Sequence, residues 1–298
     1  MKHLLSIEKT DAAEMREILE LAGKLKAERG AHSTQPLAGQ TWGMIFSKSS
    51  TRTRVSFEVG IRELGGSVIF MGARDMQLGR GEPIKDTARV LGRMTHGAVI
   101  RTYAQADVED FAEYSKIPTI NALTDFGHPC QILTDVFTFE EQRGSIEGKV
   151  VTFVGDGACN VATSWVFAAR KLGFELRIAA PKKYQPDAAL LERAGGKVSC
   201  HEDLNKAAEG SDLLYTDVWV SMGHEEEGAR RIEELKGYQI NQKLVARANE
   251  GALVMHCLPA YRGKEILEET LEAHADTIFT EAENRLHAQK AILQWIVS

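Results

Sequence analysis

Six consecutive residues combine hydroxyl and guanidinium groups where a predicted strand turns into a helix: Ser49, Ser50, Thr51, Arg52, Thr53 and Arg54. A helix start carries unpaired backbone N–H groups and the positive end of the helix dipole. Two arginines there oppose the dipole unless an anion offsets their charge. Hydroxyls and planar guanidinium forks suit phosphate oxygens, so the turn predicts a site for a phosphate-bearing small molecule. The alternative is an N-cap followed by a solvated basic turn.

Other polar residues follow the ends of other apolar runs. Arg101 ends one of these runs, so it either points into a cleft beyond the sheet or lies on an edge strand. His128 and Gln131 offer hydrogen bonds to a carbonyl oxygen and an amide, although a turn with Pro at the helix start explains them equally. Asp217 either receives an ammonium group or caps a turn. Cys257 has only the adjacent histidine as an activating base, which favours a neutral or core thiol over a covalent role.

The segment from Gly155 to Asn160 resembles a dinucleotide-binding turn, but Asn160 occupies the third glycine position. The next predicted strand ends without the acidic residue that would bind a ribose. The sequence therefore does not favour NAD binding. Asn160, at a helix start, is either an N-cap or a ligand amide.

Short apolar runs alternate with helical patterns, which predicts an α/β protein with mainly parallel sheets. The helices begin near residue 11, at Pro83 (burying Ile84, Val90, Leu91 and Met94) and after Pro129. Parallel sheets bind ligands at the carboxyl ends of their strands, where the polar residues above fall. The predicted strands cover residues 42–46, 67–71, 98–102, 119–123, 149–154, 175–179, 212–217, 252–256 and 277–279.

A polar, glycine-containing segment at 142–145 precedes a new strand and suggests a division of the chain. We expect two domains, each a mainly parallel sheet flanked by helices. Residues 1–140 would form the first domain and residues 141–280 the second. The amphipathic helix at 281–298 would return to the first domain.

The composition is that of an ordinary globular protein, with 298 residues, 43% hydrophobic and 26% charged. A net charge of −6 and the absence of basic tracts disfavour nucleic-acid and anionic-membrane binding. No apolar stretch reaches membrane-span length, and the start lacks the features of a signal peptide. Four widely spaced cysteines suggest a reduced, cytoplasmic chain without a disulfide framework or a zinc site.

Taken together, the motifs resemble the aspartate/ornithine carbamoyltransferase family, in family order over nearly the whole chain. The segments Ser50–Arg54 and His128–Gln131 mark enzymes that use carbamoyl phosphate. The Ser-Met-Gly and His-Cys-Leu-Pro segments indicate ornithine as the amine. Cys159 and Tyr261 depart from the usual pattern. The matching segments are Ser50–Arg54, Gln77–Glu82, His128–Gln131, Asp217–Gly223, His256–Pro259 and Glu283–Arg285.

The resemblance implies carbamoyl phosphate on the first domain, ornithine on the second, and a trimer or multiple of trimers with Gln77 supplied by a neighbouring subunit. Carbamoyl phosphate would be held by Ser50, Thr51, Arg52, Thr53, Gln77, Arg101, His128, Gln131, Cys257, Leu258 and Arg285. Ornithine would be held by Asn160, Asp217, Ser221 and Met222. The catalytic set would be Arg52, Thr53, Arg101, His128 and Cys257.

The implied reaction is attack of a neutral amine on the carbonyl carbon of carbamoyl phosphate, as in arginine biosynthesis, and it needs no metal or organic cofactor. The sequence leaves three alternatives open. The first is a carbamoyltransferase that acts on putrescine or a modified ornithine. The second is a dehydrogenase, and the third is a non-catalytic binding subunit. Whether the reaction runs towards citrulline or back is not encoded in these motifs.

Overall fold

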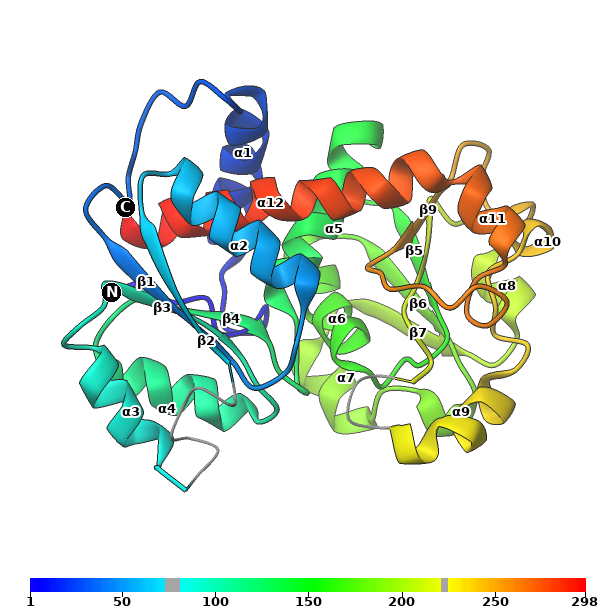
Figure 1. Ribbon diagram of the computed structural model, residues 1–298. Coiled ribbons are helices and arrows are strands. Elements are labelled where there is room, and N and C mark those ends of the chain that lie inside the picture. The colour runs from blue at the N-terminus through cyan, green and yellow to red at the C-terminus, as the bar shows by residue number, and fades with distance from the viewer. Residues whose placement is uncertain (73–80, 221–224) are drawn as a thin grey trace. The chain divides into compact units, whose positions relative to one another are not determined.

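The computed structural model describes residues 1–72, 81–220 and 225–298. The chain divides into two units, one made of residues 1–137 and 284–298 and the other of residues 138–283. Each unit contains a parallel β-sheet with flanking helices (Figure 1). The predicted α/β class, with mainly parallel sheets, is therefore confirmed.

The first unit is built on a sheet with strand order β2-β1-β3-β4, in which every neighbouring pair is parallel. In Figure 1, α1 and α2 cover one face of this sheet and α3 and α4 cover the other. The strands are β1 (Thr41–Phe46), β2 (Ser67–Gly72), β3 (Gly97–Arg101) and β4 (Thr119–Leu123). The helices are α1 (Ala12–Ala27), α2 (Thr51–Glu63), α3 (Ile84–Leu91), α4 (Gln105–Ser115) and the first part of α5 (Pro129–Arg143).

The second unit is built on a parallel sheet with strand order β7-β6-β5-β8-β9. Its strands are β5 (Val150–Val154), β6 (Glu175–Ala179), β7 (Lys197–His201), β8 (Leu213–Thr216) and β9 (Leu253–His256). Its α-helices are α6 (Asn160–Leu172), α7 (Ala188–Ala194), α8 (Leu204–Ala208), α9 (Gly228–Leu235), α10 (Gln242–Val245) and α11 (Glu268–Ala273). Short 3₁₀ turns span Lys182–Tyr184 and Glu225–Glu227.

The strands differ in burial. The inner strands β3 and β8 are buried at every position, because helices cover both faces of a parallel sheet. Of the edge strands, β2 and β7 are largely half-exposed, whereas β4 and β9 are almost entirely buried. The sequence pattern missed β7, since its residues Lys-Val-Ser-Cys-His contain a single aliphatic side chain.

Two local predictions were wrong. Residues 277–279, predicted as a strand, lie within the long helix α12 (Ala275–Val297). The run is too short for periodicity to distinguish strand from helix, and the helical residues on both sides decide its conformation. Val90 and Met94, predicted to be buried, are 48% and 71% exposed, because Ala88 is the buried position of α3.

The last part of α12 belongs to the first unit, as predicted for the C-terminal helix. Its apolar residues Ile292, Leu293 and Trp295 are almost fully buried. Lys26 of α1 donates a hydrogen bond of 2.8 Å to Oδ1 of Asn284 on α12. None of the helices within the described ranges has both the length and the apolar character that a membrane span requires.

Candidate active site

The turn between β1 and α2 caps the helix with one of the predicted hydroxyls. Ser50 is the N-cap, and its Oγ accepts a hydrogen bond of 3.3 Å from the backbone N–H of Thr53. The same Oγ donates to Oγ1 of Thr53 at 3.0 Å. Thr51 and Arg52 are exposed, and the first turn of α2 contains no acidic residue. The positive end of α2 is therefore open to an anion, with Arg52 beside it.

The guanidinium of Arg285, on α12, forms hydrogen bonds with three of the predicted site residues, Thr53, His128 and Gln131. Its Nη2 donates to Oγ1 of Thr53 at 3.0 Å and to Nε2 of His128 at 2.9 Å. Its Nη1 donates to Oε1 of Gln131, whose amide in turn donates to Asp135 at 2.6 Å. Residues from α2, from the start of α5 and from the C-terminal helix thus meet in one buried cluster.

His128 is neutral in this cluster. Complete burial, followed by the charges of Arg285 and Arg101, holds its pKa well below the usual value of 6.5. Because a guanidinium only donates, Nε2 of His128 accepts from Arg285, and the ring proton lies on Nδ1. Arg101, at the carboxyl end of β3, is only 4% exposed. Two guanidiniums beside a neutral imidazole favour a ligand with more than one negative charge.

Lys48, which lies in the same turn as Ser50, is a buried cation that was not predicted from the sequence. Lys48 is buried, forms an ion pair with Asp125, and its ammonium lies 4.2 Å from the ring centre of Tyr103. A lysine two residues after the end of a buried strand was the available signal. It adds a third buried cation to the carboxyl edge of the first sheet.

The buried His128 predicts a pH-dependent stability. On unfolding, His128 regains an ordinary pKa, so below about pH 6.5 the unfolded chain binds a proton that the folded chain does not. The free energy of unfolding should therefore fall as the pH drops below about 6.5. In His128→Gln, urea titrations between pH 5 and 8 should show a slope smaller by roughly one proton. The exposed His96→Gln is the control, and equal slopes in both variants would contradict the assignment.

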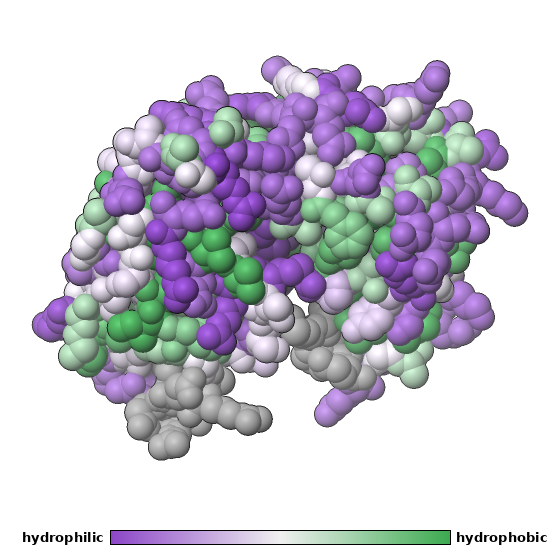
Figure 2. Space-filling view, turned by 45° about the horizontal axis from the view of Figure 1, so that its top comes forward, coloured by the Kyte–Doolittle hydropathy of each residue, from purple (hydrophilic) through white to green (hydrophobic). Residues whose placement is uncertain are grey.

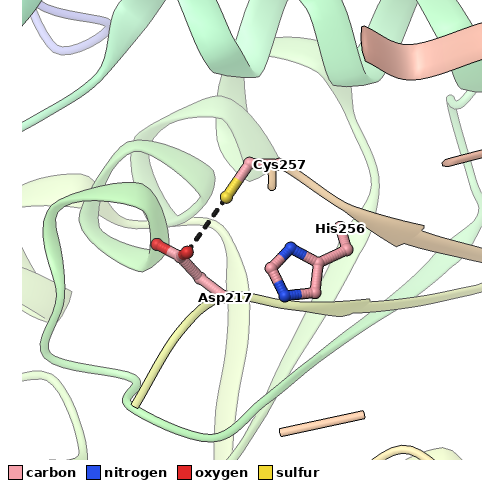
Figure 3. Close-up of side chains that lie close together, drawn as sticks. All are labelled: Asp217, His256 and Cys257. Atoms are coloured by element: carbon pink, nitrogen blue, oxygen red, sulfur yellow. Dashed lines mark hydrogen bonds between the residues drawn. The ribbon is translucent and has the colours of Figure 1, made fainter. Parts of the chain in front are cut away.

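The second unit presents an acidic group at the carboxyl edge of its sheet (Figure 3). Asp217 follows β8, and its Oδ1 accepts hydrogen bonds from the Val218 N–H at 2.7 Å and from the Cys257 thiol at 3.0 Å. The Cys257 thiol is thus the donor in this contact and is directed at the Asp217 carboxylate rather than at the His256 imidazole. Asp217 is 9% exposed, which suits it to a partly desolvated ammonium group.

His256 does not activate Cys257. Its Nδ1 accepts from the Leu258 N–H at 2.9 Å, so its proton lies on Nε2, 3.2 Å from Oε1 of the buried Glu265. Leu258 has a positive φ of 53°, a strained conformation for a branched side chain. Asp217, His256 and Cys257 place potential metal ligands within 4.8 Å of one another. The imidazole, however, has both nitrogens engaged, so it offers no lone pair to an ion.

Asn160 is not the N-cap of α6, which excludes one of the two readings open from the sequence. The N-cap is Cys159, whose Sγ accepts from the Ala162 N–H at 3.4 Å. Burial, followed by the charges of Asp156 and Asp217, raises the pKa of the Cys159 thiol well above its usual value. Asn160 therefore lies in the first turn of α6 with its amide not used for capping.

A buried ion pair between Asp156 and Arg231 was not anticipated from the sequence. Asp156 lies in the turn after β5, and Arg231 lies on α9. Arg231 also donates to the backbone carbonyl of Trp219 at 2.9 Å and lies over the ring of Tyr184. Burial raises the pKa of Asp156, and Arg231 partly offsets this shift. One guanidinium thus joins the β5 turn to the segment that follows Asp217.

The structure brings Thr53, His128, Gln131 and Arg285 into direct hydrogen-bonding contact, with Ser50 bonded to Thr53 and Arg101 close enough to shift the pKa of His128. In the second unit it joins Asp217 to Cys257. Gln77, Ser221 and Met222, which were also predicted as site residues, lie outside the described residues.

Both units match known protein families. Residues 2–141 match the carbamoyl-P binding domain of aspartate/ornithine carbamoyltransferases, and residues 147–296 match their Asp/Orn binding domain. A parallel α/β chain with a cationic site on one unit and an acidic site on the other thus has the architecture of a two-substrate transferase. The chain belongs to the aspartate/ornithine carbamoyltransferase family.

The similar proteins described here are all named ornithine carbamoyltransferase, which is one activity within that family. The ornithine carbamoyltransferase of Akkermansia muciniphila is 56% identical, covering 98% of this chain and 97% of its own length. That of Methylococcus capsulatus is 50% identical, covering 100% and 99%. Among solved structures, the anabolic ornithine carbamoyltransferase from Campylobacter jejuni superposes with a TM-score of 0.93 at 43% identity, with 99% of both chains covered. The Pyrococcus furiosus enzyme gives 0.92 at 43% identity, covering 98% of this chain and 96% of its own.

Proposed function

We infer that this chain is an ornithine carbamoyltransferase, which transfers the carbamoyl group of carbamoyl phosphate to the side-chain amine of L-ornithine and releases citrulline and phosphate. The observation that carries this inference is the buried Arg285 cluster at the open, positive end of α2. Such a cluster has no purpose in a scaffold, because each buried cation costs desolvation that an anionic ligand offsets. The full-length relatives named above support the same activity.

For the first substrate, we propose that Ser50, Thr51, Arg52, Thr53 and Arg285 bind the phosphate oxygens, together with Gln77 and Gln131. Arg101, Thr53 and His128 would stabilise the negative charge that develops on the carbonyl oxygen. Removal of one such donor typically costs about 10²–10³ in rate. In His128, the donor facing the substrate would be Nδ1–H, since Nε2 is bound by Arg285.

For the second substrate, we propose that Asp217 binds an ammonium group of ornithine, with Asn160, Ser221 and Met222 as further contacts. Cys257 and Leu258 would contact carbamoyl phosphate. In the reaction, the neutral side-chain amine forms a C–N bond to the carbonyl carbon while the C–O bond to phosphate breaks. The amine proton would pass to a phosphate oxygen, because the Cys257 thiol donates to Asp217 and His256 is bound on both nitrogens.

Citrulline formation by the purified chain tests this function. The enzyme should convert ornithine and carbamoyl phosphate to citrulline, measured colorimetrically, and should use putrescine at least about 100-fold less efficiently. A second carbamoyltransferase specificity, for putrescine or a modified ornithine, was open from the sequence, but the relatives' names do not favour it. Absence of citrulline from the folded protein would refute the proposal.

The Arg231–Asp156 pair predicts a selective effect on the amino acid. In Arg231→Gln, the segment after Asp217 loses its anchor at the Trp219 carbonyl, and Asp156 is left near Asp217 without its cation. The KM for ornithine should rise by roughly tenfold or more, whereas the KM for carbamoyl phosphate should stay unchanged. Arg230→Gln is the matched control, since Arg230 is exposed and forms a surface ion pair with Glu227 at the start of α9. Equal KM values for ornithine in the two variants would contradict the anchoring role.

We propose further that the chain forms a homotrimer or a multiple of trimers and works in arginine biosynthesis in the cytoplasm. Two exposed apolar side chains of the first unit, Val55 on α2 and Ile69 on β2, support an interface there. Figure 2 shows hydrophobic residues among hydrophilic ones on the visible face of the molecule. The four free thiols support a reducing compartment. Light scattering after gel filtration should give three times the chain mass or a multiple of it.

We also propose the assignment of substrates to domains. Carbamoyl phosphate would bind to residues 1–140 and ornithine to residues 141–280, with residues 281–298 completing the first domain. The cationic cluster of the first unit and the acidic group of the second support this division. Calorimetry with carbamoyl phosphate and an Asp217 variant tests it, because binding of the first substrate should be spared.

A further inference from the structure

Lys290 of α12 carries an ammonium group that is entirely buried in the first unit and that is not among the residues assigned to a substrate. Its Nζ lies 2.7 Å from Oε2 of Glu63, 2.8 Å from Nε2 of His32 and 3.3 Å from the carbonyl oxygen of Leu25. These three acceptors use all three N–H donors of the ammonium group. They come from the last residue of α2, from the segment after α1, and from α1 itself.

Stability alone is a poor explanation for this arrangement. Taking an ammonium group out of water is costly, and replacing a buried ion pair with apolar side chains of similar volume is often neutral or stabilising. Arg29 also approaches Glu63, at 3.4 Å, so the carboxylate has a second cation available. A buried lysine with all its hydrogen bonds made does, however, fix geometry, because these bonds can form in only one relative placement of α2 and α12.

That placement bears on the candidate active site through the same two helices. Arg285 lies about one and a half turns before Lys290 on α12 and bonds Thr53 in the first turn of α2. Lys290 bonds Glu63 in the last turn of α2. The two helices also pack closely at Gly60 of α2. A Cβ added at this glycine would lie 3.2 Å from Cγ of Lys290. Figure 1 shows α2 and this part of α12 side by side.

We propose that Lys290, with Glu63 and His32, is a positioning device that fixes the rotation and axial position of α12 on α2 and so aims the Arg285 guanidinium at the phosphate end of carbamoyl phosphate. A shift of α12 by one residue would move Arg285 by about 1.5 Å and turn it by about 100°. A misplacement of about 1 Å can cost roughly 10²-fold in rate. The proposal rests on the substrate role proposed for Arg285.

The expected signature is specific to one substrate. Lys290→Met keeps an unbranched apolar stem but lacks the ammonium group and so removes all three hydrogen bonds. The KM for carbamoyl phosphate should rise roughly tenfold, and the affinity for inorganic phosphate in calorimetry should fall in parallel. The KM for ornithine at saturating carbamoyl phosphate should stay unchanged. Glu63→Gln, which keeps an acceptor but loses the charge, should give a smaller effect in the same direction.

A double-mutant cycle with Arg285→Ala tests whether Lys290 acts through Arg285. If it does, Lys290→Met should have no further effect on the KM for carbamoyl phosphate once Arg285 is absent. Arg177→Met is the matched control, since it removes a half-buried guanidinium that bonds the Ala207 and Glu209 carbonyls of the other unit. It should lower the melting temperature without changing either KM.

Two results separate the failure of this inference from the failure of the site. If Arg285→Ala raises the KM for carbamoyl phosphate but Lys290→Met does not, or if the two effects add, the positioning role is overturned while the site stands. If Arg285→Ala leaves that KM unchanged, the site assignment itself falls and the inference falls with it. Should Lys290→Met fail to fold, Glu63→Gln supplies the same cycle, because Glu63 is partly exposed and its replacement is milder.

Discussion

Replacing Arg101 with methionine should lower kcat/KM for carbamoyl phosphate by about 10³ or more. Arg101 is a buried guanidinium at the carboxyl end of β3, and its charge acts on His128. Its loss would remove a donor from the carbonyl oxygen and one of the cations that offset the phosphate charge. Methionine keeps the flexible apolar stem, so packing changes little. Steady-state kinetics at saturating ornithine measure the effect.

The effect should be confined to carbamoyl phosphate. The KM for ornithine in Arg101→Met should change less than about threefold, and the neutral His128 should gain proton affinity, since one of the two cations that lower its pKa is gone. Arg62→Met is the matched control, because Arg62 is exposed and contributes only a surface pair with Glu58. If Arg101→Met were as active as Arg62→Met, Arg101 would have no place in the site.

Replacing Asp217 with asparagine should raise the KM for ornithine by about 10–100-fold while leaving the KM for carbamoyl phosphate unchanged. Asparagine preserves the shape of the side chain and an acceptor for the Val218 N–H and the Cys257 thiol. It removes the negative charge that would hold an ammonium group in a partly desolvated site, and it replaces one acceptor oxygen with an NH₂ donor. Initial rates with each substrate varied in turn measure both constants.

Two further variants sharpen this test. Glu192→Gln removes an exposed carboxylate on α7 and should leave both KM values unaltered. Cys257→Ser keeps a donor to Asp217 and separates loss of the thiol from loss of the carboxylate charge. A comparable rise in both KM values for Asp217→Asn would show that the second unit does not bind the amino acid separately.

Much of the fold could be predicted because it depends on short-range patterns. The strands at 119–123 and 175–179 are observed at their predicted bounds, since buried parallel strands are short apolar runs between turn residues. Two predictions were wrong for the opposite reason: the edge strand β7 was missed, and residues 277–279 were predicted as a strand. A half-exposed strand lacks an apolar run, and three residues at 277–279 cannot reveal the helix that extends on both sides of them.

The sequence by itself determined the class of fold and the location of Ser50–Thr53, Arg101, His128 and Asp217 at the carboxyl ends of strands. Only the tertiary structure decided which side chains meet. Arg285 is separated from Thr53 by 232 positions, Lys290 from Glu63 by 227, and Cys257 from Asp217 by 40. Local patterns follow from backbone periodicity, whereas these contacts depend on how distant helices and strands pack, which no single segment encodes.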